Sequence, residues 1–205
     1  MGLAGVTAAK AAGCETIVAV DLVDERLELA RELGATHTTN SSTTENVSKE
    51  IRKTTGGLDL AMEAVGLEAV IRDALKSLRS PGICATVGLQ GFANPIAVDQ
   101  SHLLMGRTLT GVIEGDANPH QLIPRLVEWW RAGIFPFDRL VSEYSFDDLA
   151  TAIDDLRAGR VVSRSCAWAP PEESATARGT RRSPRGRAGR GRASVANVIS
   201  WWGEG

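Results

Sequence analysis

The sequence lacks the features that mark secreted or membrane proteins. Its three cysteines, Cys14, Cys84 and Cys166, form no C-x-x-C pair, which argues against a zinc knuckle and against a disulfide framework. No run of about 18 apolar residues occurs, so no membrane span is expected. A basic segment followed by an apolar one is also missing at the N-terminus, so no secretory signal is predicted. The expected compartment is the reducing cytoplasm.

Metal-ligating residues are equally sparse. The three histidines, His37, His102 and His120, are scattered and share no cysteine or acid at metal-ligand spacing. We expect structural or surface roles for them and no metal site. Cys14 and Cys84 fall in apolar runs, which is typical of packed thiols.

Charge is unevenly distributed along the 205 residues, although the formal net charge is only −2. Residues 163–205 hold eight Arg, no Lys and three acids, a formal charge of +5. Residues 1–162 hold 15 basic and 22 acidic residues, a formal charge of −7. Such different compositions predict two regions with a boundary near Val162, the first with an ordinary packed core.

Helix-like and strand-like stretches alternate from residue 1 to residue 162. Apolar or β-branched runs predict strands at 16–20, 36–40, 58–64, 83–89 and 108–113. Between and after them, helices are predicted to begin near Gly5, Asp24, Ser42, Glu68, Pro119 and Ser145. The start at Ser42 rests on a capping box with Glu45. Strands separated by helices at this interval indicate a parallel sheet covered on both faces, an α/β doubly wound fold.

The C-terminal region has a different character. Residues 178–192 are rich in Arg, Gly, Ala and Ser and cannot bury enough surface to offset the entropy of ordering. Val195–Trp202 is apolar but short and isolated. We expect a disordered tail over residues 163–205 and interpret the switch after Val162 as out-of-frame reading of GC-rich DNA. Because Arg/Gly segments contact RNA, nucleic-acid binding through the tail is an alternative.

Gly2 and Asp21 have the spacing of a dinucleotide-binding βαβ unit. The run at 16–20 ends in Asp21, about 20 residues after Gly2, the offset that places a carboxylate on the adenosine ribose. The alternative is an ordinary turn acid. In the first interpretation Gly2 is the last glycine of G-x-G-x-x-G, and the first strand is missing. That strand is central, so we expect either that the true start of the protein lies upstream of Met1, or that a gap, a re-paired sheet or low order separates the strands ending at Asp21 and Ala64.

Several motifs occur in the order and spacing of one enzyme family. They are Gly2-Leu3-Ala4, Val20-Asp21, Arg26-Leu27 and Leu33-Gly34-Ala35. With them, residues 1–162 resemble the coenzyme domain of zinc-type medium-chain alcohol dehydrogenases, which implies a Rossmann-like fold. Glu114-Gly115-Asp116 followed by Phe135-Pro136-Phe137-Asp138-Arg139-Leu140 is most similar to the aryl-alcohol branch.

The resemblance implies an NAD site. Gly2 and Leu3 would lie under the pyrophosphate, at a helix N-terminus that favours anions. Asp21 would accept hydrogen bonds from the adenosine ribose and repel the 2′-phosphate of NADP. Arg26 matches a basic residue beside this ribose, although a solvated helix residue is the alternative. The other implied contacts are Ala64, Val65 and Gly66 on the adenosine side and Gly88, Leu89 and the backbone from Val112 to Glu114 around the nicotinamide.

The family's zinc ligands and catalytic groups precede the coenzyme strand, in a domain absent from this sequence. We therefore assign no catalytic residue and no zinc ligand. The expected function is the coenzyme-binding part of an NAD-dependent alcohol dehydrogenase, without turnover by the chain alone. The alternative is a non-enzymatic NAD-binding remnant of a degraded or mis-annotated gene. The family pairs edge strands between subunits, which implies a homodimer through residues 108–113.

Overall fold

Six parallel strands form the sheet of the first structural unit. A computed structural model describes residues 1–167 and 197–201. The chain divides into two units, one comprising residues 1–127 with the strand at 197–201 and the other beginning at residue 128. The spatial order of the sheet is β2 (His37–Asn40), β1 (Thr16–Asp21), β8 (Asn197–Trp201), β3 (Leu58–Glu63), β4 (Leu78–Thr86) and β5 (Arg107–Gly111).

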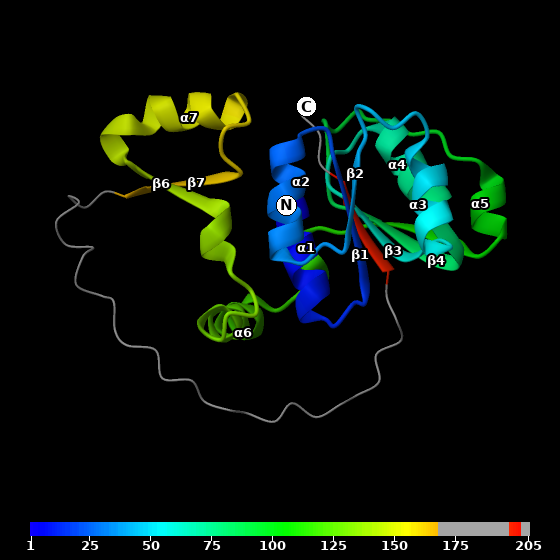
Figure 1. The fold of residues 1–205 in the computed structure, drawn as a ribbon, viewed down its shortest axis with the longest axis horizontal. Coiled ribbons are helices and arrows are strands. Elements are labelled where there is room, and N and C mark those ends of the chain that lie inside the picture. Colours follow the sequence, from blue (N-terminus) through cyan, green and yellow to red (C-terminus); the bar gives the residue numbers. More distant parts are fainter. Residues whose placement is uncertain (168–196, 202–205) are drawn as a thin grey trace. The chain divides into compact units, whose positions relative to one another are not determined.

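Helices cover both faces of this sheet, which confirms the doubly wound α/β fold. Figure 1 shows α1 (Gly2–Ala11) and α2 (Asp24–Leu33) on one face and α3 (Val47–Thr55) and α4 (Glu68–Ser77) on the other. A fifth helix, α5 (Gln100–Leu104), precedes β5. The core contains buried side chains of β1, α3, β3, α4 and β4.

The burial of β1 explains why its sequence is continuously apolar. The side chains from Ile17 to Val20 are all at most 4% exposed. A strand that is covered on both faces has no polar face, so an alternating pattern is not expected. The predicted strand at 16–20 is thus confirmed, and its carboxyl end is Asp21.

The start of α3 differs from the prediction. The helix begins at Val47, and the side chain of Asn46 caps it by accepting a hydrogen bond of 2.9 Å from the backbone N–H of Lys49. The capping box predicted at Ser42 is wrong. The Ser42 hydroxyl instead donates to the Asn40 side chain, 2.6 Å away, so this local turn takes the place of a first helical turn.

The largest departure from the sequence prediction is β8. A gap, a re-paired sheet or low order was expected between the strands ending at Asp21 and Ala64, and the structure has a re-paired sheet. The segment that forms the new strand lies within Val195–Trp202, which was expected to be disordered. In the structure β8 lies between β1 and β3 and pairs in parallel with both. Two buried strands flanking an empty position would leave N–H and C=O groups unpaired, at about 1–3 kcal/mol each. An apolar segment that reaches the position removes this cost.

The second unit contains a small βαβ arrangement. Its elements are the end of α6 (Pro119–Arg131), η2 (Phe137–Leu140), β6 (Val141–Ser145), η3 (Phe146–Asp148), α7 (Leu149–Arg157) and β7 (Ser163–Ala167). β6 and β7 pair in parallel. The Tyr144 hydroxyl and the Arg160 Nε each donate a hydrogen bond of 2.7 Å to Asp155. These donors hold the pKa of Asp155 below its ordinary value.

Strands β7 and β8 both lie in the tail that was expected to be disordered. β7 is polar in sequence, and its pairing with β6 gives its backbone hydrogen-bond partners that no sequence period could indicate. The rest of the predicted disordered tail, 168–196 and 202–205, lies outside the described residues. Within the described ranges, no helix is long and apolar enough to cross a lipid bilayer.

Candidate functional site

The predicted site residues gather at one edge of the first unit's sheet. Because all its strands are parallel, the segments that follow β1, β3, β4 and β5 leave the sheet at the same edge. Asp21 is the last residue of β1, and the segments that follow β3, β4 and β5 contain Ala64–Gly66, Gly88–Leu89 and Val112–Glu114. This is the edge at which ligands bind in open α/β sheets.

The first group of site residues surrounds a small cleft. Gly2 and Leu3 at the start of α1, Asp21 at the end of β1 and Arg26 in α2 all line it. The cleft encloses about 10 Å³, which is room for roughly one water molecule. The structure therefore brings together the four residues that the sequence predicts around the pyrophosphate and the adenosine ribose.

The Asp21 carboxylate is held in place by its neighbours. Asp21 is only 5% exposed. Its Oδ1 accepts a hydrogen bond of 2.9 Å from the backbone N–H of Val23 and lies 3.8 Å from Nη1 of Arg26. The ion pair is mostly buried, since the two side chains are 11% and 8% exposed. Arg26 thus fixes the acid and occupies part of the cleft.

The N-terminus of α1 presents backbone donors with positive partial charge. The Met1 side chain makes no capping hydrogen bond, and the first turn contains no acidic residue. The first N–H groups of a helix have no partner within the helix, and the helix dipole makes this end attractive to anions. Gly2 and Leu3 are therefore suited to bind a phosphate group.

A buried acid organises the second group of site residues. Glu63, at the end of β3, is 0% exposed. Its Oε1 accepts hydrogen bonds from the backbone N–H groups of Val65 (2.6 Å) and Gly66 (2.7 Å). Its Oε2 accepts a hydrogen bond of 2.9 Å from the Thr86 hydroxyl at the end of β4. One carboxyl group therefore ties the loops after β3 and β4 together.

These two loops also touch through their backbones at two glycines. A Cβ on Gly88 would lie 2.5 Å from the backbone nitrogens of Gly66 and Val65, and one on Gly66 would lie 2.7 Å from the nitrogen of Leu89. Gly66 also has a φ of +83°. Neither position has room for a side chain, because the atoms in the way belong to the backbone.

Several residues of this second group were not predicted from the sequence. Besides Glu63 and Thr86, the side-chain amide of Gln90 donates to the carbonyl of Val65, and that of Asn94 donates to the carbonyl of Gly66, both at 2.7 Å. The only available signal was an acid at the end of an apolar run. No sequence pattern indicates that amides 25 and 28 residues further along the chain reach this loop.

Val112 and Glu114 are the site residues least connected to the others. The backbone N–H of Val112 donates to the carbonyl of Thr86 at 3.0 Å, which continues the pairing of β4 and β5 beyond the strand ends. Glu114 is exposed and begins the short helix η1 (Glu114–Asp116) with a φ of +56°. Its side chain therefore faces solvent.

The histidines do not form a metal site. His37 contacts the Thr36 hydroxyl through Nδ1 at 2.9 Å, and His102 lies beside Arg107. Burial and the Arg107 charge lower the pKa of His102. Across the residues that the structure describes, no three His, Cys, Asp or Glu side chains are close enough to hold a metal ion. This part of the chain therefore does not fit a zinc ion.

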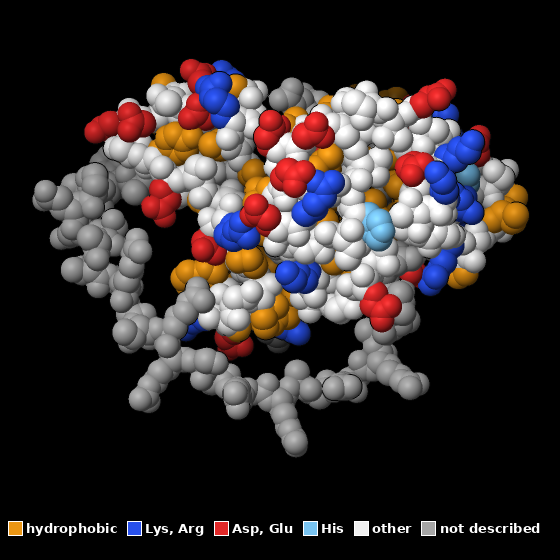
Figure 2. Space-filling model, in the orientation of Figure 1, with side chains coloured by type: hydrophobic (Ala, Val, Ile, Leu, Met, Phe, Trp, Pro, Cys, Tyr) orange, Lys and Arg blue, Asp and Glu red, His pale blue; other side chains and the backbone are white. Residues whose placement is uncertain are grey.

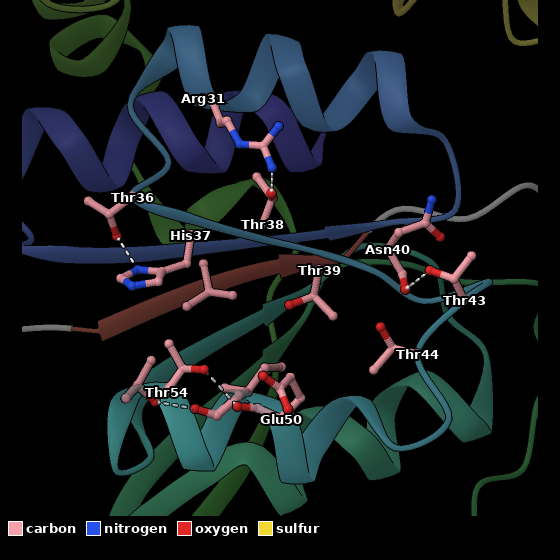
Figure 3. Close-up of a pocket in the computed structure, with 13 residues that line it drawn as sticks. Arg31, Thr36, His37, Thr38, Thr39, Asn40, Thr43, Thr44, Glu50 and Thr54 are labelled. Atoms are coloured by element: carbon pink, nitrogen blue, oxygen red, sulfur yellow. Dashed lines mark hydrogen bonds between the residues drawn. The ribbon is translucent and has the colours of Figure 1, made fainter.

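A larger pocket lies between β2 and α3 (Figure 3). It encloses about 620 Å³ and is lined mainly by polar side chains, most of them threonines, and by none of the predicted site residues. Its hydroxyls are partly used internally, as in Thr54, which donates to the carbonyl of Glu50 at 3.0 Å. We therefore place the candidate site at the sheet edge.

The face drawn in Figure 2 shows no basic patch. Lysines and arginines are interspersed there with acidic side chains. Nucleic-acid binding, the alternative function considered for the tail, concerns the Arg-rich stretch 178–192, which lies outside the described residues.

Comparison with known proteins places the chain in a family. A family model described as zinc-binding dehydrogenase matches residues 1–130, so the chain belongs to the zinc-binding dehydrogenase family. It is 33% identical over 164 residues to geraniol dehydrogenase from Castellaniella defragrans, covering 79% of this chain and 44% of that protein. The predicted resemblance to zinc-type alcohol dehydrogenases is thus confirmed.

Solved structures agree with this assignment. An alcohol dehydrogenase zinc-binding domain protein from Burkholderia ambifaria has a TM-score of 0.77 and 40% identity, over 80% of this chain and 45% of that one. Benzyl alcohol dehydrogenase from Acinetobacter calcoaceticus has a TM-score of 0.78 and 38% identity, over 80% and 46%. The chain spans less than half the length of these relatives.

The Glu63 network predicts a measurable loss of stability on substitution. Glu63→Gln replaces one acceptor oxygen by an amide nitrogen, which cannot accept the hydrogen bonds that Glu63 receives. We expect the free energy of unfolding in urea to fall by about 1.5–3 kcal/mol. The matched variant is Glu68→Gln, whose side chain is 41% exposed and should change stability by less than about 0.5 kcal/mol. Equal effects of the two variants would contradict the network.

The reactivity of the Cys84 thiol provides a second test of the same region. Burial and the nearby Glu63 carboxylate raise the pKa of Cys84 to about 12. At pH 8 roughly one thiol in 10⁴ is ionised, and the thiolate is the reactive form. Iodoacetamide should therefore modify Cys84 at least a hundredfold more slowly in the folded protein than in urea. Mass spectrometry of the Cys84 peptide measures both rates, and similar rates would show that the thiol is not buried.

Proposed function

We propose that this chain binds NAD(H) as the coenzyme-binding part of an NAD-dependent alcohol dehydrogenase. The observation that carries the proposal is the cleft in which Gly2, Leu3, Asp21 and Arg26 meet. A helix N-terminus suited to a phosphate and a buried carboxylate suited to a ribose lie on either side of it. Family membership and the name of benzyl alcohol dehydrogenase support the same function.

Different residues of the cleft would bind different parts of the coenzyme. The backbone N–H groups of Gly2 and Leu3 would bind the pyrophosphate oxygens, and Asp21 would accept hydrogen bonds from the ribose hydroxyls. Arg26 keeps the Asp21 carboxylate oriented through the 3.8 Å ion pair. A second negative group beside Asp21 would be repelled, which favours NAD over NADP.

The loops after β3, β4 and β5 would form the rest of the site. The Glu63 hydrogen bonds hold Ala64 to Gly66 beside Gly88 and Leu89, so these loops are preorganised before a ligand arrives. Leu89 is 63% exposed, and an aromatic ring of the coenzyme could cover it. When bound, the coenzyme supplies the hydride acceptor, and the protein supplies its position.

Oxidation of an alcohol requires groups beyond those described here. The described residues offer no zinc ligands, so we derive no chemical step for them. In the proposed role this chain binds the coenzyme without turning over alcohols by itself. The proposed homodimer contact is β5, which is an edge strand of the sheet and has mostly exposed residues.

The proposal predicts that Asp21 governs coenzyme affinity and selectivity. Asp21→Asn removes one of the two carboxylate oxygens that would accept the ribose hydrogen bonds. It also removes the negative charge that would repel a 2′-phosphate. We expect the Kd for NADH, measured by fluorescence titration, to rise by roughly tenfold to a hundredfold, or about 1.4–2.8 kcal/mol. The preference for NADH over NADPH should narrow at the same time.

The matched control is Asp99→Asn, because the Asp99 side chain is 73% exposed and lies outside the cleft. It should leave the Kd for NADH unchanged. The assignment is wrong if the unsubstituted protein does not bind NADH although its circular dichroism spectrum shows that it is folded. It is also wrong if Asp21→Asn and Asp99→Asn have the same effect.

A further inference from the structure

Strand β8 occupies the position of the first strand of a dinucleotide-binding fold. The usual spatial order of that fold is 3-2-1-4-5-6. The order here is β2-β1-β8-β3-β4-β5. If β1 and β2 are the second and third strands and β3 to β5 are the fourth to sixth, β8 stands at position one, although it is last in the chain.

The direction and register of β8 also fit a first strand. A strand that only covered open backbone groups could pair in either direction. β8 pairs in parallel with both neighbours, as position one requires. Its last residue, Trp201, pairs with Val20 on one side and Glu63 on the other. The strand therefore ends level with both groups of site residues.

The helix that normally follows the first strand is also in place. In the usual fold the first strand leads through a glycine-rich turn into the helix that binds the pyrophosphate. Here α1 begins at Gly2, in the same cleft as Asp21, and Asp21 directly follows Val20. The carboxyl end of β8 and the start of α1 thus lie at the same edge of the sheet, although they are the last and first elements of the chain.

We propose that β8 fills, within the same molecule, the position that the first strand holds in the usual dinucleotide-binding fold. The coenzyme site is then completed by β8, which lies between the strands that position its two groups of residues. The proposal depends on the proposed function only for the identity of the ligand.

The chain is long enough for this exchange within one molecule. Twenty-nine residues separate the end of β7 at Ala167 from the start of β8 at Asn197. Extended, they reach roughly 95 Å, several times the width of a small domain. The strand of the same molecule is therefore the proposed occupant, and the strand of a second copy is an outcome that the experiment separates.

A disulfide between neighbouring strands tests the proposal directly. Met62 and Ser200 are paired in the register of β3 and β8. Met62→Cys with Ser200→Cys is introduced into the full chain after Cys14→Ser, Cys84→Ala and Cys166→Ser. Adjacent strands place paired Cα atoms within the 4.4–6.8 Å range of a disulfide. Mild oxidation without coenzyme should link residues 62 and 200 in the monomer, as read by non-reducing gel and peptide mass spectrometry.

The control pairs Ser200 with a residue that is aligned with it across the sheet but lies on a more distant strand. Thr110 on β5 pairs with Ala85, which pairs with Met62, so three strand spacings, about 14 Å, separate Thr110 from Ser200. Thr110→Cys with Ser200→Cys should not form the disulfide. The proposal is overturned if both cysteine pairs form the disulfide equally, or if the disulfide joins two chains. It is also overturned if neither pair forms the disulfide in protein whose circular dichroism spectrum shows that it is folded.

Coenzyme binding then separates this proposal from the proposed function. Deleting residues 197–205 should raise the Kd for NADH at least tenfold, while the oxidised M62C/S200C protein should keep the affinity of its reduced form. If the disulfide forms but NADH does not bind, the strand replacement stands and the proposed function fails. If NADH binds equally well after the deletion and no disulfide forms, the strand replacement is wrong.

Discussion

The position between β1 and β3 is the constraint on which this structure depends. Both strands are buried, and each presents a row of N–H and C=O groups to the other across one strand's width. Buried backbone groups need partners, and a few unpaired ones would cost as much as the roughly 5–15 kcal/mol that stabilises an ordinary domain. With β8 in place, both rows are paired, and the strand ends that form the site lie at one edge.

The candidate site depends on this paired sheet and on two local sets of polar contacts, one around Glu63 and one between Arg26 and Asp21. Glu63 fixes the loops after β3 and β4 by accepting three hydrogen bonds at a fully buried position. Arg26 fixes Asp21 on the other side of β8. Each set of contacts holds a surface on which one half of a dinucleotide could lie. Neither set joins the two halves, so their spacing depends on the central strand.

The sequence predicts the parts of the fold that local patterns encode. The continuous apolar run before Asp21 and the glycine and acid spacing were sufficient to locate β1 and to group Gly2 with Asp21. Patterns failed where pairing is long-range. Asn197–Trp201 looks isolated because its partners are more than 130 residues away in the sequence. Glu63 carries little sequence signal because two of its donors are backbone groups and the third, Thr86, is 23 residues away. At α3, Asn46 is the cap in place of the predicted Ser42.

Hydrogen exchange read by mass spectrometry, with and without NADH, is the most direct test of the account. The amides of residues 17–20, 60–62 and 198–200 should exchange slowly and together, because the three strands form one hydrogen-bonded centre. NADH should slow exchange further in the segments around Asp21 and Gly88. Exchange of 198–200 at the rate of an unfolded peptide, with no effect of NADH elsewhere, would contradict the account.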